Sequence, residues 1–168
     1  IVGPRYAPGG GNGPHLVVPG GYGWTPTYKE DASLYNPATN QWTPLPPWPT
    51  GFTGRERPGL VATSSDIIIW GGYGSSPTAK LDGIKDTFAT NTWTPISTTG
   101  SPGGRYEFAY AWDEVGQQMI VFGGYGTTYM NTIHAYKPAT DTWHTLAPAI
   151  ISGRREMQFA WDPGRRWL

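Results

Sequence analysis

Arginines and glutamates are the residues of this chain whose spacing first suggests chemistry. An arginine preceded by glycine or proline occurs at Arg5, Arg55, Arg105 and Arg154, with intervals of 50, 50 and 49 residues. A glutamate follows each of the last three within two residues, at Glu56, Glu107 and Glu156. Neighbouring cations and carboxylates can bind charged ligands or transfer protons. Because an active site needs asymmetry and this pattern repeats, we predict that these arginines have a structural role.

Other catalytic and metal-binding chemistry finds little support in the sequence. The chain has no cysteine, which excludes disulfides, cysteine-ligated zinc and thiol catalysis. Its three histidines, His15, His134 and His144, are scattered, and each is expected to be an ordinary sheet residue. No run of residues supplies several oxygens at the spacing of a calcium loop. We therefore expect no catalytic residue, no metal and no cofactor within this stretch.

Charge and composition narrow the class of protein. Twelve basic and twelve acidic residues balance, and no basic run is longer than a pair, so a nucleic-acid partner is not expected. No apolar stretch approaches the roughly 20 residues of a membrane-spanning helix. The 24 glycines, 17 prolines, 9 tryptophans and 10 tyrosines disfavour helices and favour short strands joined by turns. We predict an all-β fold without a membrane span.

Two further markers share the period of the arginines. A double glycine begins at Gly20, Gly71 and Gly123, with intervals of 51 and 52 residues. A tryptophan that follows a polar turn occurs at Trp42, Trp93 and Trp143, with intervals of 51 and 50 residues. Three markers with one period indicate a structural repeat, since small insertions in connecting loops are well tolerated.

The third repeat predicts four strands. Residues 106–112 alternate between polar and apolar, 119–122 form an apolar run that ends at the double glycine, 132–136 alternate again, and 142–146 close the unit. The second repeat has the same order. The first repeat opens with the glycine-rich stretch YAPGGGNGP, which predicts a short or frayed first strand. Each unit is therefore expected to be a four-stranded antiparallel meander.

Four-stranded units of about 50 residues are typical of the kelch repeat, in which each unit forms one blade of a β-propeller. The chain resembles this family in its double glycine, followed by a tyrosine and then a tryptophan seven residues later, as in Tyr35 with Trp42 and Tyr136 with Trp143. The turns NPATNQW and KPATDTW are most similar to those of bacterial members, and the likeness extends to the central domain of galactose oxidase. In the second repeat, Asp86 stands where the tyrosine is expected, and we expect Phe88 to compensate for it.

The resemblance implies a kelch-type β-propeller that forms an incomplete arc of a larger ring. Three four-stranded blades and the start of a fourth would occupy 1–168, at about 5–50, 54–100, 104–150 and 153–168. Propellers close with four to eight blades, so three blades would leave two open faces. We therefore expect the remaining blades to come from the same, longer chain or from another chain.

The repeated residues are expected to serve packing. Strand ends buried between neighbouring sheets need residues without a Cβ where backbones approach closely, and large aromatic rings can fill the space between blades. The residues assigned to this structural group are Gly20, Gly21, Gly71, Gly72, Gly123, Gly124, Tyr35, Tyr136, Trp42, Trp93, Trp143, Arg55, Arg105 and Arg154.

The loops are where a ligand is expected. In kelch propellers, the loops between second and third strands share a face with those between blades, and here these loops are polar and rich in aromatic residues. Such surfaces suit protein or glycan ligands. The candidate binding residues are Tyr22, Trp24, Tyr28, Trp48, Phe52, Arg57, Tyr73, Tyr125 and Tyr129. Arg57, which lies outside the repeat pattern, is the candidate for an anionic ligand, whereas the repeated tyrosines at 22, 73 and 125 could instead cap each blade.

Two classes of function remain open at this point. The first is a non-catalytic binding or assembly module of a larger, exported bacterial protein, with an extracellular or cell-surface location and the periplasm as the alternative. The second is the propeller of an enzyme, such as a sugar mutarotase or an oxidase similar to galactose oxidase, with catalytic residues outside this segment. Such an oxidase needs a cysteine, which is absent here, whereas Glu56 and Arg57 could supply polar groups to a mutarotase. We favour the binding module.

Overall fold

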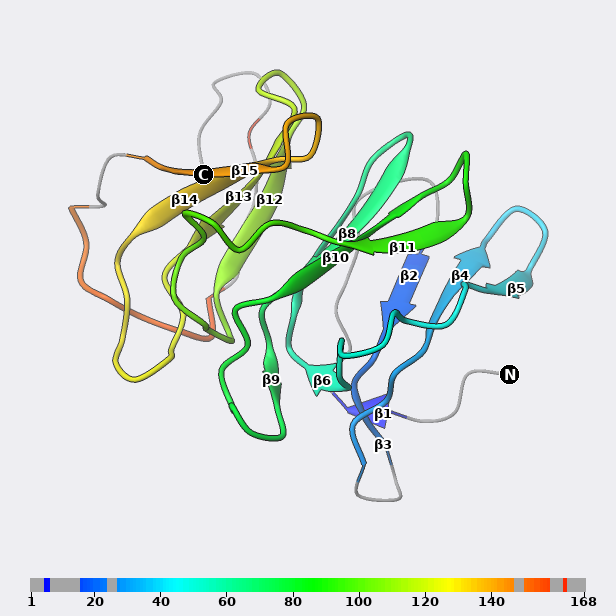
Figure 1. The fold of residues 1–168 in the computed structure, drawn as a ribbon, viewed down its shortest axis with the longest axis horizontal. Helices are drawn as coiled ribbons and strands as arrows, with labels where there is room; N and C mark the ends of the chain where they lie inside the picture. The colour runs from blue at the N-terminus through cyan, green and yellow to red at the C-terminus, as the bar shows by residue number, and fades with distance from the viewer. Residues whose placement is uncertain (1–4, 7–15, 24–26, 147–149, 158–161, 163–168) are drawn as a thin grey trace.

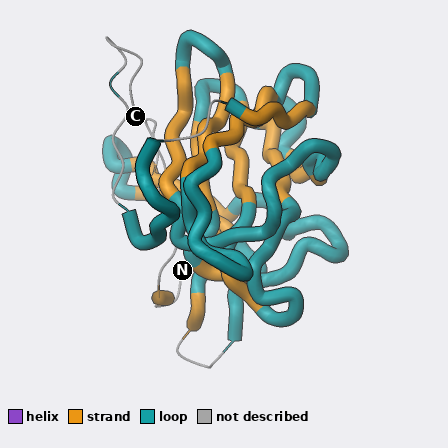
Figure 2. Tube along the Cα trace, turned by 90° about the vertical axis from the view of Figure 1, so that its left-hand side faces the viewer, coloured by secondary structure: helices purple, strands orange, loops and turns teal. Residues whose placement is uncertain are grey.

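The computed structural model describes residues 5–6, 16–23, 27–146, 150–157 and 162. Within these residues the chain forms strands, turns and loops, and no helix, as the composition predicted. Figure 2 shows the strands grouped in the middle of the molecule, with loops at both ends.

Two complete blades follow one another along the chain. The second repeat forms a sheet of β7 (Gly59–Ala62), β8 (Asp66–Trp70), β10 (Gly83–Thr87) and β11 (Thr92–Pro95). The third forms a sheet of β12 (Ala109–Asp113), β13 (Gln118–Phe122), β14 (Ile133–Lys137) and β15 (Thr142–Thr145). Every neighbouring pair is antiparallel and the strands of each sheet follow chain order, with only the short β9 (Tyr73–Gly74), which belongs to another sheet, between β8 and β10, so each blade is the predicted meander. The sheets stand side by side (Figure 1).

The first repeat contributes three described strands, β2 (Leu16–Pro19), β4 (Ala32–Asn36) and β5 (Gln41–Pro44), which pair in that order. The expectation of a frayed first strand falls mainly on residues 7–15, which lie outside the described residues. Two small sheets complete the strand set: β1 (Arg5–Tyr6) pairs with β3 (Tyr22–Gly23), and β6 (Arg55–Glu56) pairs with β9 (Tyr73–Gly74). We number the blades 1 to 3 in chain order.

The double glycines join neighbouring blades through their backbone. The N–H groups of Gly21, Gly72 and Gly124 donate to the carbonyl oxygens of Arg55, Arg105 and Arg154 at 2.7, 2.8 and 2.8 Å, each from one blade to the next repeat. At Gly72 the φ angle is +104°, and a Cβ would lie 2.9 Å from the carbonyl oxygen of Glu56. A side chain here would therefore meet both a strained backbone and a steric clash. The sequence predicted glycine at these positions because backbones approach closely there. The inter-blade hydrogen bond from the glycine N–H is a second reason for that close approach.

Two apolar clusters fill the spaces between the blades. Blades 1 and 2 enclose one, which includes Val17, Leu60 and Ile69, and blades 2 and 3 enclose the other, which includes Trp70 and Met119. All five of these side chains have 0% exposure. The core of the arc is therefore the set of interfaces between sheets, where burial of apolar surface is the main stabilising contribution.

The repeated tryptophans seal these interfaces in two of the three blades. The indole Nε1 of Trp93 donates to the carbonyl oxygen of Pro46 at 2.9 Å, and that of Trp143 donates to Ser97 at 3.0 Å. Each acceptor lies in the linker that follows the preceding blade, and both rings are 7% exposed. Trp42 is 44% exposed, so the prediction that it fills an inter-blade space is wrong for this structure, because no described blade precedes it.

Asp86 occupies the position that tyrosine holds in the other blades. Tyr136 is fully buried and its hydroxyl donates to Asp141 at 2.8 Å. Asp86 is equally buried, yet neither carboxylate oxygen has a hydrogen-bond partner among the described residues. Burial, and then the charge of Asp66, raises the pKa of the Asp86 carboxyl. Phe88 is 38% exposed and does not fill the site, so the expected compensation is wrong.

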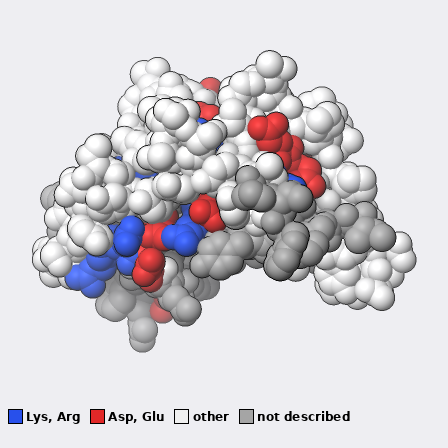
Figure 3. Space-filling model, turned by 90° about the horizontal axis from the view of Figure 1, so that it is seen from below, with Lys and Arg blue, Asp and Glu red and all other residues white. Residues whose placement is uncertain are grey.

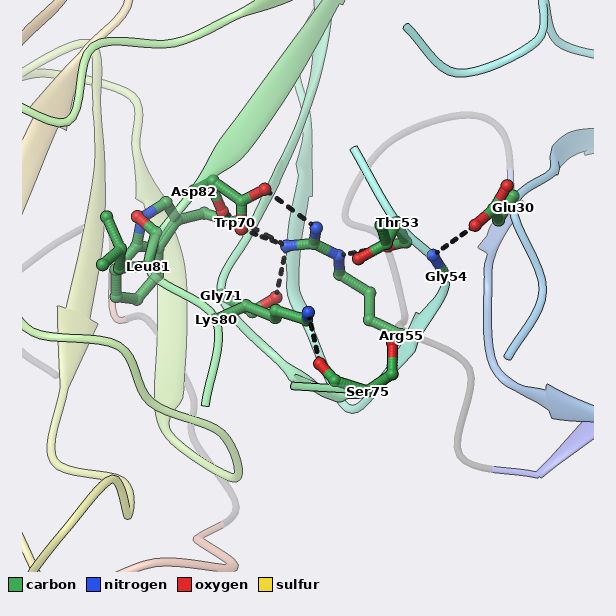
Figure 4. A network of polar contacts seen from close by, with 10 residues as sticks. All are labelled: Glu30, Thr53, Gly54, Arg55, Trp70, Gly71, Ser75, Lys80, Leu81 and Asp82. Carbon is green, nitrogen blue, oxygen red and sulfur yellow. Dashed lines mark hydrogen bonds and ion pairs between the residues drawn. The ribbon is translucent and has the colours of Figure 1, made fainter. Parts of the chain in front are cut away.

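Two buried arginines, Arg55 and Arg105, anchor the starts of blades 2 and 3 to the double glycine of the same blade. Arg55 is 0% exposed, and its guanidinium donates to the carbonyl oxygens of Thr53 at 3.0 Å and Gly71 at 3.2 Å (Figure 4). Two further bonds join it to the carboxylate of Asp82, at 2.9 and 3.0 Å. The ring of Phe52 lies 3.6 Å from the guanidinium carbon. The carboxylate that pairs with Arg55 is thus Asp82, 27 residues away, and not the adjacent glutamate that the sequence pattern suggested.

Burial lowers the pKa of Arg55. Burial also opposes ionisation of Asp82, but the hydrogen bonds and charge of Arg55 outweigh it and lower the pKa of that carboxyl. Arg105 is buried in the same way in blade 3, at 2% exposure. Arg154 is exposed, although its backbone carbonyl accepts the inter-blade bond from Gly124.

Candidate binding face

The loops between second and third strands meet the loops between blades at one end of the sheets. Pairing of Glu56 with Tyr73, and an isolated bridge between Tyr106 and Tyr125, hold the two kinds of loop together. We call this end the loop face; its described parts lie within 20–31, 46–58, 71–82, 96–108, 123–132 and 150–157. The view from below the fold shows acidic and basic side chains gathered on it (Figure 3). The shared face implied by the kelch resemblance is confirmed.

Six tyrosines form a continuous row across this face. Successive ring centroids along the row are 5.1, 6.3, 5.0, 5.8 and 5.1 Å apart, all in edge-to-face geometry. Five of the rings are half-buried, and the last, Tyr129, is 53% exposed. In order, the tyrosine row consists of Tyr22, Tyr28, Tyr73, Tyr106, Tyr125 and Tyr129. Because it crosses from blade 1 to the far side of blade 3, it presents an extended aromatic surface.

An ion cluster lies next to the row. Glu107 pairs with Arg57, and its second carboxylate oxygen lies 3.3 Å from Nε of Arg155. The Glu107 side chain is 5% exposed, whereas those of Arg57 and Arg155 are 30% and 35% exposed. The guanidinium carbon of Arg155 also lies 5.2 Å from the ring centre of Tyr125 and 5.8 Å from that of Tyr129. Two partly exposed guanidiniums therefore lie against one buried carboxylate.

The backbone of this cluster adopts a conformation that is uncommon for residues other than glycine. Arg57, Glu107 and Glu156 have φ angles of 55°, 55° and 57°. All three follow a repeat arginine by two residues, so the fold imposes the left-handed conformation at this position of each repeat. Strained backbone of this kind is concentrated at functional sites, where the surrounding structure holds it in place.

Glu56 adds a half-buried carboxylate beside Arg57. Burial raises the pKa of Glu56, and the charge of Arg57 opposes this shift. Burial also raises the pKa of Tyr28, with smaller contributions from Tyr73 and Glu56. These shifts leave the tyrosine hydroxyl protonated at neutral pH, where it can donate or accept a hydrogen bond.

The structure brings together most of the residues that the sequence assigned to ligand binding. Tyr22, Tyr28, Tyr73, Tyr125 and Tyr129 belong to the tyrosine row, and Arg57 belongs to the ion cluster. Trp24 lies outside the described residues. The role of these tyrosines and of Arg57 in ligand binding stays a prediction.

Trp48 and Phe52 require a correction. They are 9% and 7% exposed and pack against each other with ring centroids 5.0 Å apart, within the cluster between blades 1 and 2. Phe52 also covers Arg55. The first inter-blade loop folds inward because both rings bury apolar surface in this cluster, so neither ring is part of an exposed binding surface.

Two residues of the face, Tyr106 and Arg155, were missed by the sequence reasoning, and Glu107 was noted only as part of the repeated charge pattern. All three lie one or two positions after a repeat arginine, where Glu56 and Arg57 lie in blade 2. Their position relative to the repeat arginine was the signal that could have identified them. The side chains at this position differ between blades, so they do not form a visible sequence pattern.

A small pocket opens at the opposite end of the sheets, where the turns of blades 2 and 3 meet. Its volume is about 180 Å³, and Nζ of Lys85 donates across it to the carbonyl oxygen of Pro138 at 3.4 Å. The lining residues are Thr63, Ser65, Asp66, Lys85, Trp112, Gln117, Pro138 and Ala139. Within this lining, the Ser65 hydroxyl donates to the Asp66 carboxylate at 2.6 Å, and the same carboxylate accepts from the Thr87 hydroxyl at 2.8 Å.

Within the described residues, no group of three His, Cys, Asp or Glu side chains could hold a metal ion. His134 and His144 lie in β14 and β15, and burial, followed by the charge of Arg105, lowers the pKa of His134 to about 4. The described part of the chain contains no helix with the length and apolar character needed to span a membrane.

Comparison with known proteins gives a consistent result. The family model described as "KLHDC2/KLHL20/DRC7 Kelch-repeats domain" matches residues 4–164. Kelch-like protein 35 of Homo sapiens is 29% identical over 118 residues, which are 70% of this chain and 18% of that protein. The Mus musculus protein of the same name is 28% identical over 118 residues, 70% of this chain and 19% of that protein.

A plant enzyme is also similar. N-(sulfonatooxy)prop-2-enimidothioate sulfolyase of Thlaspi arvense is 30% identical over 122 residues, which are 64% of this chain and 34% of that protein. The chain therefore spans between about a fifth and a third of the length of these relatives. They come from mammals and a plant, and the bacterial, galactose-oxidase-like character stays a prediction.

Proposed function

The chain belongs to the Kelch-repeat family, and from this premise we propose that it is a non-catalytic protein-binding module whose contact surface is the loop face. Kelch repeats generally mediate interactions between proteins, and no described residue of the loop face needs a catalytic role to explain its position. The observation that carries the proposal is the tyrosine row, which runs unbroken over three repeats and ends beside the ion cluster.

The chemistry of the face favours an extended protein segment with an acidic side chain. Tyrosine gives a large contact area with few rotatable bonds, so ordering it on binding costs little entropy. Tyrosine and arginine are also the residues most enriched among binding hot spots. The guanidinium of Arg155 is partly exposed and has donors other than the Nε that faces Glu107, so it can pair with an incoming carboxylate without displacing Glu107.

A glycan is the second candidate ligand. Tyr129 is 53% exposed and lies at the open end of the row beside Arg155, where a sugar ring could stack on it.

We further propose that the module is part of a larger exported bacterial protein that supplies the remaining blades, at the cell surface or in the periplasm. Only four lysines among many threonines, glycines and aromatic residues support this setting. Protease treatment of intact cells and of spheroplasts that express the full-length protein tests it: a surface module is cleaved in intact cells, a periplasmic module only in spheroplasts, and cleavage in neither would contradict the proposal.

Selection of a displayed random-peptide library against the chain tests the proposed face. Peptides with acidic residues should be enriched, and Arg155→Ala and Tyr129→Ala should each weaken their binding at least about tenfold, a typical hot-spot loss of about 1.4 kcal/mol or more. Lys137→Ala is the matched control, because Lys137 is exposed and lies at the opposite end of β14. Peptides whose binding depends on Lys137 and not on Arg155, or no enrichment at all, would count against the proposal.

A further inference from the structure

Arg105 lies at the boundary of blades 2 and 3, as Arg55 does at the boundary of blades 1 and 2. Nε of Arg55 donates to Thr53 at 3.0 Å, and Nε of Arg105 donates to Gly103 at 3.1 Å. Their NH1 groups donate to the first glycine of their own blades, Gly71 at 3.2 Å and Gly123 at 2.9 Å. The two guanidiniums are therefore held in the same way.

The partner of the guanidinium differs between the two blades. Gly71 donates to the backbone carbonyl of Asp82, and Gly123 donates to that of Thr132, so these two residues occupy equivalent positions. Asp82 gives Arg55 two charged hydrogen bonds, at 2.9 and 3.0 Å. Thr132 gives Arg105 only a hydroxyl, at 3.3 Å from NH1. Among the described residues, no carboxylate pairs with Arg105.

A buried guanidinium without a counter-charge is costly. Arg105 is 2% exposed, and a charge removed from water is normally compensated by an opposite charge. Burial lowers the pKa of Arg105 to about 10, so the group keeps its proton at neutral pH. The aromatic cover is missing as well, because Phe52, three residues before Arg55, is replaced by Pro102, three residues before Arg105.

The position facing Arg105 can be reached from solvent. In blade 2, the Asp82 side chain is 40% exposed even though Arg55 is 0% exposed, so the carboxylate lies at the boundary with water. In blade 3, the equivalent Thr132 is half-buried. His134 follows on the same strand face, where blade 2 has the fully buried Ile84, and it too is half-buried. Blade 3 thus has polar groups where blade 2 has a carboxylate and an apolar side chain.

We propose that Arg105 binds a carboxylate from outside the chain, at the place that the Asp82 carboxylate fills beside Arg55, with the hydroxyl of Thr132 and the imidazole of His134 beside it. A small carboxylic acid and a carboxylate on a peptide share this chemistry. Met130 replaces Lys80 at the equivalent position of blade 3, so Arg105 is the principal cation of the site and a free carboxylate should bind in the millimolar range. The site exists independently of the protein-binding role proposed for the loop face.

Exchange of the two equivalent residues tests this site. Thr132→Asp should supply the carboxylate internally, raise the thermal midpoint, and remove the response to added acetate. Asp82→Thr should create a second site of the same kind, so that acetate stabilises this variant more than the wild type. Thr132→Ser, which keeps the hydroxyl and leaves the place of the carboxylate open, should keep the acetate response, whereas Thr132→Asn, which fills that place with an uncharged amide, should lose the response without the rise in thermal midpoint.

The measurements are the thermal midpoint and the calorimetric heat of binding on titration with sodium acetate, with sodium chloride added to hold the ionic strength constant. One acetate per chain should bind to the wild type. Short peptides that end in a carboxylate are then compared with their C-terminal amides. A response to the acid peptide alone identifies a peptide source, and a response to acetate alone identifies a small acid.

Equal acetate responses in wild type and Thr132→Asp, or no response in either wild type or Asp82→Thr, would overturn the proposal. Should Thr132→Asp not fold, the comparison of Asp82→Thr with the wild type still decides between these outcomes.

Discussion

Trp143 and Trp42 occupy the same position of the repeat in very different surroundings, and replacing each with alanine tests the blade packing. Trp143 is 7% exposed, its ring lies 5.0 Å from that of Trp70 and 5.2 Å from that of Tyr136, and its indole donates to Ser97. Trp42 is 44% exposed, and Tyr35, at 5.0 Å between ring centroids, is its one aromatic neighbour among the described residues.

The expected loss of stability follows from these contacts. Removing a buried tryptophan side chain costs about 3–5 kcal/mol through lost transfer free energy and the cavity that remains. In Trp143→Ala, the carbonyl oxygen of Ser97 also loses its donor, which adds about 1 kcal/mol. Trp42→Ala removes a ring that is already partly in water, so we expect about 1–2 kcal/mol. The difference should be at least about 2 kcal/mol, a large share of the stability of a typical domain.

Urea denaturation followed by circular dichroism measures both values. With a slope of about 2 kcal/mol per molar urea, the midpoint of Trp143→Ala should lie roughly 1 M or more below that of Trp42→Ala. Light scattering at the same concentrations checks that the chain is monomeric, because self-association could cover Trp42. Equal destabilisation of the two variants in a monomeric protein would refute the assignment of Trp143 to a buried interface and Trp42 to an open face.

Two further substitutions test buried features of the fold. Asp86→Asn should stabilise the protein at neutral pH. Burial raises the pKa of the Asp86 carboxyl, so the stability of the wild type falls as pH rises from the usual aspartate pKa to the raised value. The variant should lack this loss when thermal midpoints are measured against pH. Identical pH profiles would contradict it. Gly72→Ala should lower the free energy of unfolding, measured by urea denaturation, more than Gly51→Ala. Both positions have positive φ angles, of 104° and 92°, but only at Gly72 would the new Cβ meet backbone atoms, the nearest at 2.9 Å. Equal losses would show that the clash at Gly72 is relieved at no cost.

The inter-blade contacts explain how a repeat fold can support a variable binding face. Each of the three double glycines forms the same backbone hydrogen bond to the next repeat arginine, and this bond does not involve the side chains one and two positions after that arginine. The residues one and two positions after the arginine are therefore free to differ, as Glu56 and Arg57 differ from Tyr106 and Glu107. A constant framework with variable loop residues is the usual division of labour in repeat proteins.

The sequence alone determined the repeat, the strand order within each blade and the all-β class. These properties are local: alternation of polar and apolar residues, glycines at strand ends and polar turns act over a few residues and are visible in the chain. The double glycines and the tyrosines after them were assigned to the correct loops for this reason.

Only the tertiary structure decided which residues meet across the blades. Arg55 pairs with Asp82 and not with its neighbour Glu56, and Glu107 lies between arginines of the preceding and following repeats. Trp48 and Phe52 fall inside the core although their loop has the composition of a surface loop. Such outcomes depend on which sheet faces which, and on the need to shield a buried charge, and neither is encoded within the few residues that a local pattern spans.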